Sequence, residues 1–409
     1  MKPNRHLTAG VSKAIALLFA GSALTFGAAA HATPYVQTDL VTDDQAFLAS
    51  LGYAPAASVD LNLINPWGMS YTPGGSPIWV SDNGTGVSTL YPVTAAGLLG
   101  PPNATRVVIP PPAIGGPALP TGQVNTGLSG ATDFLVPNGA GGTVKSAFIF
   151  ATEGGTIAAR TAGNVSISMV DNSLAGAVYK GLAIGNSSAG WVLYAADFAK
   201  GQIEVFNSHF APITLAGNFT GSAPPAAPPG FVYAPFNVQM LNGNLYVTYA
   251  LKDLSAPGDD VAGAGNGYVE EFTLNGNFVR RIATNGVLNS PWGLDIAPAA
   301  FGQFANDLLV GNLGDGTINV YDPNNTNVLL GTLTNGNDVI HIDGLWGLIN
   351  GNGGNSGAVG SVYFAAGIGD EAHGLFGALT ATPEPSTLAL LAAGLLGIGA
   401  FGRRRKVTA

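Results

Sequence analysis

Ser290-Pro291-Trp292-Gly293-Leu294 is the stretch that decides the fold, because the chain repeats it. Two further copies read Asn65-Pro66-Trp67-Gly68-Met69 and Gly344-Leu345-Trp346-Gly347-Leu348, and weaker copies occur at 131–134, 179–182 and 235–238. Each copy opens a predicted strand, in which tryptophan fills the space between neighbouring sheets and glycine allows backbones to approach closely. We therefore interpret the three tryptophans as core residues; the alternative is a platform on which sugar rings stack.

A pair of short strands follows each copy, joined by a turn that contains glycine. The first strands of the pairs are predicted at 78–82, 148–152, 193–197, 245–249, 308–312 and 362–366, and the second strands at 86–91, 156–161, 202–207, 268–273, 317–322 and 375–380. Three or four strands repeated six times predict an all-β, six-bladed β-propeller over residues 33–382, with seven blades as the alternative. The last blade lacks an outer strand, and the alternating residues 35–41 are predicted to supply it and close the ring.

Charge and cysteine content exclude several classes of function. Residues 33–382 hold 8 Lys or Arg and 23 Asp or Glu, a net charge of −15. Nucleic acid is therefore excluded as a partner, because phosphate binding needs a basic surface. The 409-residue chain has no cysteine, which excludes thiol catalysis and zinc sites built from thiolates.

The N-terminus is typical of a secretory signal peptide. Lys2, Arg5 and Lys13 precede an apolar stretch from 14 to 30, and Ala30-His31-Ala32 gives the small residues expected at the cleavage site. We predict a signal peptide over residues 1–32, and export of the mature chain.

The C-terminus has the composition of a sorting tail over residues 383–409. Its parts are a triplet, an apolar run at 387–401 predicted to enter the membrane, and a basic cluster that the positive-inside rule places in the cytoplasm. The triplet is Pro383-Glu384-Pro385, and the cluster includes Arg403, Arg404 and Arg405. The tail resembles the PEP-CTERM signals of Gram-negative bacteria, which implies processing by an exosortase-type enzyme. The expected location is the cell envelope, the outer surface or the medium, with transient anchoring in the inner membrane; the alternative is a permanent anchor.

The amino-acid sequence of residues 253–376 is distinctive. It includes Gly258-Asp259-Asp260-Val261-Ala262-Gly263, Asp343-Gly344-Leu345-Trp346-Gly347 and Asp370-Glu371-Ala372-His373-Gly374. These segments resemble a family of exported bacterial propeller proteins of uncharacterised activity, many of which carry PEP-CTERM tails. The resemblance implies a six-bladed, NHL-like propeller and supplies no catalytic residue.

Polar residues recur where the predicted middle strands end, and Asp343 precedes an inner strand. If the blades align, these residues lie around one mouth of the ring and offer the oxygen ligands that Ca²⁺ prefers. The predicted metal ligands are Asp82, Glu153, Asp197, Asn312 and Asp343. The alternative is that these side chains cap tight turns.

A long loop at 252–267 is the second candidate for Ca²⁺. Asp253, Asp259 and Asp260 lie on it among glycines and prolines, and long loops on rigid scaffolds often carry function. The spacing of the three aspartates differs from that of an EF-hand.

The leading functional hypothesis is a non-enzymatic ligand-binding or matrix-associated module, displayed at the surface, with the exopolysaccharide or another surface glycan of the producing cell as the candidate ligand. The alternative is a metal-dependent lactonase-like or esterase-like hydrolase with a cation in the propeller channel. The membrane is a partner only through the tail.

Overall fold

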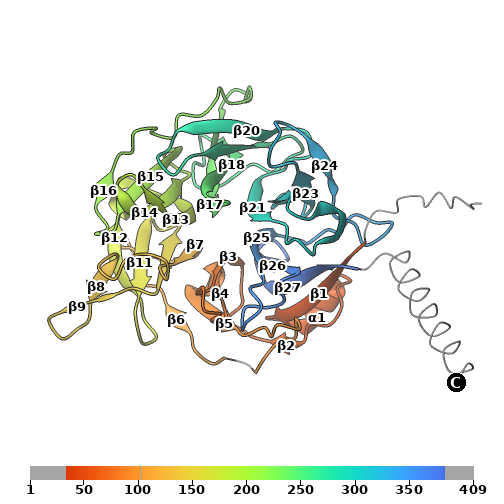
Figure 1. Cartoon of the computed structure of the whole chain (residues 1–409), viewed down its shortest axis with the longest axis horizontal. Helices are drawn as coiled ribbons and strands as arrows, with labels where there is room; N and C mark the ends of the chain where they lie inside the picture. Colours follow the sequence, from red (N-terminus) through yellow and green to blue (C-terminus); the bar gives the residue numbers. More distant parts are fainter. Residues whose placement is uncertain (1–33, 102, 383–409) are drawn as a thin grey trace, which may run out of the picture. The chain divides into compact units, whose positions relative to one another are not determined.

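The computed structural model describes residues 34–101 and 103–382, and in these the prediction of a six-bladed β-propeller is confirmed. The six sheets surround a centre that the inner strands face (Figure 1). The predicted signal peptide and the tail with its apolar run lie outside the described residues. Within them, no helix combines the length and the apolar character needed to cross a membrane.

Blades one to three follow one another along the chain, each with its strands in order from the centre outward. Blade one holds β3 (Pro66–Ser70), β4 (Ile78–Asp82), β5 (Val87–Tyr91) and β6 (Val107–Val108); blade two holds β7 (Pro120–Asn125), β10 (Phe148–Thr152), β11 (Thr156–Arg160) and β12 (Ile167–Asp171); blade three holds β13 (Tyr179–Ser187), β14 (Gly190–Asp197), β15 (Gln202–Asn207) and β16 (Pro212–Ile213). A separate hairpin, β8 (Leu135–Pro137) and β9 (Thr143–Lys145), is inserted in blade two.

Blades four to six continue this arrangement. Blade four holds β17 (Phe231–Leu241), β18 (Asn244–Asp253), β19 (Gly267–Phe272) and β20 (Phe278–Thr284); blade five holds β21 (Pro291–Ile296), β22 (Leu308–Asn312), β23 (Ile318–Tyr321) and β24 (Leu329–Thr332); blade six holds β25 (Leu345–Asn350), β26 (Ser361–Ala366) and β27 (Leu375–Ala381). Among the residues that the structure describes, the helices are α1 (Gln45–Ser50) and the single 3₁₀ turns η1 (Asn83–Thr85), η2 (Ser173–Ala175) and η3 (Gly302–Phe304).

The N-terminal strand completes blade six, as predicted. β1 (Tyr35–Thr42) pairs antiparallel with β27, with Tyr35 opposite Ala381 and Thr42 opposite Leu375, and the short β2 (Ser58–Val59) adds a parallel edge. The ring is therefore closed by strands from the two ends of the described chain, which leaves no unpaired edge between them.

One predicted strand is wrong. Residues 131–134 were expected to open blade two, but its inner strand is β7, and Phe134 has a left-handed φ of 53° just before β8. Pro120 is the first residue of β7, a place where a strand tolerates proline because no hydrogen bond from its nitrogen is needed.

The apolar core follows the repeat. Six clusters of buried side chains each lie between two neighbouring blades, and a seventh lies at the centre of the ring. Adjacent blades thus cover each other's faces, and the ring buries what a single sheet would expose.

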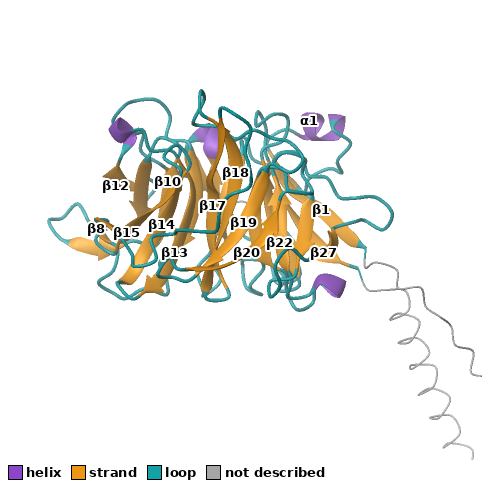
Figure 2. Ribbon diagram, turned by 90° about the horizontal axis from the view of Figure 1, so that it is seen from above, coloured by secondary structure: helices purple, strands orange, loops and turns teal. Residues whose placement is uncertain are grey.

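The two faces of the ring differ in which strand ends they carry. We call the face with the first residues of the inner strands and the last residues of the second strands the top face, for example Pro66 opposite Asp82. It lies uppermost in Figure 2, where α1 is also seen. Both ends of the described chain lie on the bottom face, where the Thr382 amide donates to the Pro34 carbonyl at 2.9 Å.

Candidate functional site

Each inner strand has a β-bulge near its top, at an equivalent residue. A bulge re-aims a side chain relative to the regular alternation of a strand. The six residues at this position, which we call the slot residues, are Trp67, Thr121, Lys180, Phe236, Trp292 and Trp346.

The residue after the slot is glycine in five blades and lies against the next blade. A Cβ at Gly68 would lie 2.6 Å from the Thr121 carbonyl oxygen, and one at Gly347 would lie 2.4 Å from that of Trp67. Blade four has Asn237 instead, whose amide donates to the Trp292 carbonyl at 2.8 Å. The inner strands are therefore held in direct contact around the centre.

Aromatic slot residues fill the centre of the ring. The rings of Trp67 and Trp346 stack with centroids 3.4 Å apart, and Trp292 meets both edge-on. All three tryptophans are buried, and Phe198 and Phe236 complete the cluster. This agrees with their interpretation as core residues.

Lys180 occupies a slot that carries an aromatic residue in four of the other five blades. Only 3% of its side chain is exposed, and its ammonium is ion-paired with Glu153, 3.7 Å from Asp259 and 5.1 Å from the centre of the Trp67 ring. Burial lowers the pKa of Lys180, but Glu153, Asp259 and Asp260 outweigh it, so the pKa is raised. The amine is charged at neutral pH and is no nucleophile there.

Two amides extend this group across the top of the channel. Asn83 donates to Glu153 at 2.9 Å, and Asn65 donates to Glu371 at 2.7 Å and to Asn83 at 3.4 Å. Trp346 holds Asn65 in turn by donating its indole N–H to the amide oxygen at 3.0 Å. We call this set the top mouth: Asn65, Asn83, Glu153, Lys180, Asp259, Asp260 and Glu371.

Two features of the top mouth cost free energy in the folded state, namely backbone strain and an excess of negative charge. Asn65 and Glu371 both have left-handed φ angles, 47° and 66°, which are uncommon for residues other than glycine and cluster at functional sites. Burial raises the pKa of Glu371, and the charges of Glu153 and Asp260 add to this, although Lys180 opposes it. Negative charge therefore exceeds positive charge around Lys180, at a mouth where Asp259 and Glu371 are exposed to solvent.

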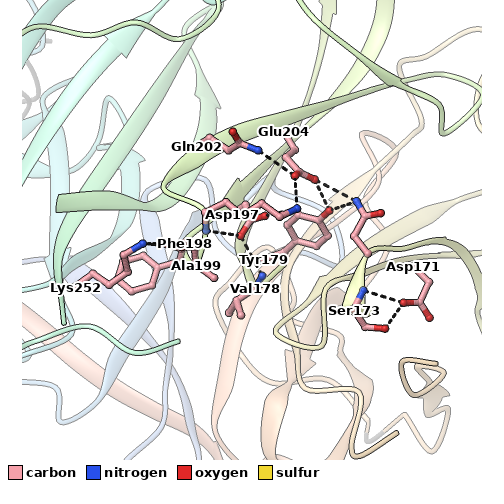
Figure 3. Close-up of polar contacts among 12 residues, drawn as sticks. Asp171, Ser173, Val178, Tyr179, Asp197, Phe198, Ala199, Gln202, Glu204 and Lys252 are labelled. Atoms are coloured by element: carbon pink, nitrogen blue, oxygen red, sulfur yellow. Dashed lines mark hydrogen bonds and ion pairs between the residues drawn. The ribbon is translucent and has the colours of Figure 1, made fainter. Parts of the chain in front are cut away.

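Three of the predicted metal ligands lie inside the blades, where their side chains form hydrogen bonds with nearby strands and turns. Asp82 accepts from the Thr89 amide at 3.0 Å. Asp197 accepts from the Val178 amide at 3.1 Å (Figure 3). It also accepts from the Lys200 amide at 3.1 Å. Asn312 donates to the Val287 carbonyl at 2.8 Å. These contacts match the turn-capping alternative.

The other predicted residues lie in three places. Glu153 from the predicted ring and Asp259 and Asp260 from the predicted loop meet at the top mouth around Lys180. Asp253 caps a local turn by accepting from the Ser255 amide at 2.7 Å. Asp343 lies apart, in a groove of about 990 Å³ that also contains Tyr53 and Asp39.

No three His, Asp or Glu side chains gather as metal ligands anywhere in residues 34–101 and 103–382. At the top mouth the positive charge is supplied by the Lys180 ammonium instead. The Ca²⁺ site stays a prediction, as does the metal-dependent hydrolase built on it.

Lys180, Asn65 and Glu371 were not predicted as site residues. The sequence contained a pattern that could have identified Lys180, because this residue occupies the tryptophan position of a repeat copy, where a charged residue is unexpected. No repeat position identified Glu371 as a site residue, since only folding brings it to Asn65, 306 residues away.

Comparison with known proteins adds a motif and relatives. Residues 381–406 match the PEP-CTERM protein-sorting motif, which confirms the predicted sorting tail. Uncharacterized protein R648 of Acanthamoeba polyphaga mimivirus is 32% identical over 339 residues, covering 81% of this chain and 79% of that protein. Uncharacterized protein L690 of the same virus is 32% identical over 342 residues, covering 79% and 82%. A solved protein of unknown function from Bacteroides thetaiotaomicron is 10% identical, with a TM-score of 0.45 and coverage of 84% and 76%.

Proposed function

Because this chain belongs to the protein family of R648 and L690 of Acanthamoeba polyphaga mimivirus, whose names state no activity, we propose its function from the top mouth and the tail: an exported, surface-sorted module that binds a glycan. The sorting motif indicates export and exosortase processing. The proposal also includes three steps of export: a signal peptide at 1–32, transient anchoring through 387–401, and release to the outer surface or the medium.

The observation that carries the proposal is the charged slot residue. A lysine among tryptophans at the centre of a ring costs free energy, because its ammonium must leave water. Among the described residues its nitrogen makes one hydrogen bond, to Glu153, although an ammonium has three donors. A ligand that enters the top mouth can therefore accept from the other N–H groups, which face Asp259 at 3.7 Å in its absence.

The chemistry of the top mouth fits hydroxyl groups. A hydroxyl accepts a hydrogen bond through its oxygen and donates one through its proton, so neighbouring hydroxyls on a sugar can serve Lys180 and the carboxylates together. Glu153 and Glu371 supply acceptors, and Asn83 supplies an amide. A ligand with its own carboxylates would be repelled, because the top mouth has four acidic residues and one basic residue. The end of a neutral surface glycan is therefore the proposed ligand.

The test measures binding to the purified full chain in detergent by calorimetry. The probes are a panel of neutral mono- and disaccharides and the exopolysaccharide purified from the producing cell. We expect Lys180→Met to weaken binding by about tenfold or more, since a hydrogen bond to a charged group contributes about 1.5–3 kcal/mol. Methionine keeps an unbranched side chain that ends one atom short of the ammonium, and it removes the charge and its contact with the Trp67 ring.

Lys145→Met is the matched control, because Lys145 lies on β9 and donates to the Ser129 carbonyl, outside the top mouth. It should bind as the wild type does. Equal binding by Lys180→Met, with a normal unfolding transition, would show that the ligand does not use the top mouth. Equal loss in both variants would have the same meaning.

A further inference from the structure

A large groove lies on the side of the ring, between blades five and six. Its volume is about 990 Å³, within the range of ligand sites, and it opens to solvent. We call it the side groove. Its ionisable residues are Tyr35, Asp39, Tyr53, Asp315, Asp338, His341 and Asp343.

The side groove is strongly acidic. Four of the residues that line it are aspartates, and no lysine or arginine of the described chain is among them. Asp315 is engaged by its own turn, where it accepts from the Thr317 amide at 3.0 Å. Asp343 accepts from the Gly369 amide through Oδ2 at 2.7 Å, and Asp338 is exposed. Walls of one sign concentrate counter-ions between them.

Asp39 gives the side groove a buried carboxylate that has no cationic partner among the described residues. It is 6% exposed, and within the described residues the hydrogen bonding of its carboxylate is limited to Oδ1, which accepts from Gln37 at 2.8 Å. Burial raises the pKa of Asp39, as expected for a carboxyl group without a cationic partner. Its charge and that of Asp343 also act on Tyr53, whose pKa burial raises to about 12.

The carboxylates are spread out rather than gathered. A divalent cation needs several oxygens converging on one point, and no three acidic or histidine side chains of the described chain do so. Charges distributed along an open groove match a ligand that carries several separate positive charges.

We propose that the side groove binds a linear polyamine-type ligand, whose ammonium groups pair with Asp39, Asp338 and Asp343. Ammonium groups donate the hydrogen bonds that these carboxylates accept. The spacers between them lie along the neutral wall that includes Tyr53. Two sources share this chemistry, a free polyamine and a deacetylated amino-sugar chain. The site is separate from the top mouth and does not depend on the glycan proposal.

The experiment uses the full chain in detergent, with spermine and a deacetylated glucosamine oligomer as the two probes, studied by calorimetry. We expect binding that weakens between about 20 and 150 mM NaCl, because the Debye length shortens to about 8 Å at 150 mM. The variant Asp338→Asn/Asp343→Asn should bind about tenfold or more weakly, since two charge pairs are lost.

Asp133→Asn/Asp171→Asn makes the same change of charge on blade two, away from the side groove, and should leave binding unchanged. Asparagine can keep the backbone contacts of each aspartate, so all four substitutions are expected to fold. Binding of one probe alone identifies the source. The proposal is overturned if neither probe binds, if salt has no effect, or if the two double variants lose binding equally.

Discussion

Lys180 shows how one residue changes the chemistry of a repeat. Five blades fill the slot with tryptophan, phenylalanine or threonine, whereas blade three places a buried ammonium there. Glu153 and Asp259 supply the opposite charge, so the group at the top mouth contains its own cation. A second cation competes with this ammonium for the same carboxylates.

Removal of the ammonium should therefore expose a cation site. We expect Lys180→Gln to lower the free energy of unfolding by about 1.5–3 kcal/mol, since the charged hydrogen bond to Glu153 is lost. Added Ca²⁺ should restore part of this loss and stabilise the variant more than the wild type. Thermal melts with EDTA and then Ca²⁺ measure both effects. Equal shifts in the two proteins would mean that the top mouth does not bind the cation.

Asp295 makes the stability of blade five depend on pH. It is buried, its Oδ2 has no hydrogen-bond partner among the described residues, and burial raises its pKa to about 8. The folded state therefore binds a proton that the unfolded state has released above about pH 4. This contribution to stability is complete below about pH 4 and is lost as the pH rises to about 8.

Asp295→Asn should remove this dependence. From about pH 5 to pH 8 the free energy of unfolding of the wild type is expected to fall relative to that of the variant, because the variant has no proton to lose. Urea unfolding at several pH values gives the two curves. Curves that stay parallel would show that Asp295 titrates normally in the folded protein.

At the scale of the element, the inner strand combines a bulge with a glycine. The bulge turns the slot residue into the channel, and the glycine lets the next blade approach. Blade two has the same arrangement in β7, although its slot residue is Thr121 and its sequence lacks the Trp-Gly pair. The bulge therefore recurs in all six inner strands, whereas the Trp-Gly pair does not.

Gly347→Ala should destabilise the ring by about 1–3 kcal/mol, the usual cost of overpacking a core. Its new Cβ would lie 2.4 Å from the Trp67 carbonyl oxygen of blade one, so two inner strands must separate. Gly74→Ala is the control, because a Cβ there has no atom within 4 Å. Urea unfolding compares the two, and equal stability would mean that the close approach is not required.

At the scale of the whole molecule, the position of the chain ends decides how the protein is presented. Pro34 and Thr382 meet on the bottom face, and the sorting motif follows from residue 381. If the tail holds the precursor at the membrane, as proposed, the top mouth lies on the face opposite the one where the described chain ends. A ligand could reach it before and after processing.

Deletion of residues 383–409 should abolish surface retention without unfolding the propeller, because β27 ends at Ala381 and its pairing with β1 is kept. Cell fractionation measures retention, and a thermal melt of the released protein measures the fold. A chain with Lys145→Met and an intact tail serves as the processed control. Unchanged fractionation of the deleted chain would exclude a role for the tail.

The sequence by itself determined the propeller, its blade number, the strand that closes it and the sorting tail. These depend on local patterns, namely alternation within strands, glycine turns between them and a repeated opening, and each pattern is complete within one blade or one terminus. Where the pattern was weak, as in blade two, the inner strand was assigned to 131–134 instead of Pro120–Asn125. Only the tertiary structure decided the top mouth, because Asn65, Lys180 and Glu371 come from different blades and meet through bulges and left-handed turns. It also placed Asp343 in the side groove and Asp82 inside its blade, since strand ends that are equivalent in sequence do not point their side chains to one centre.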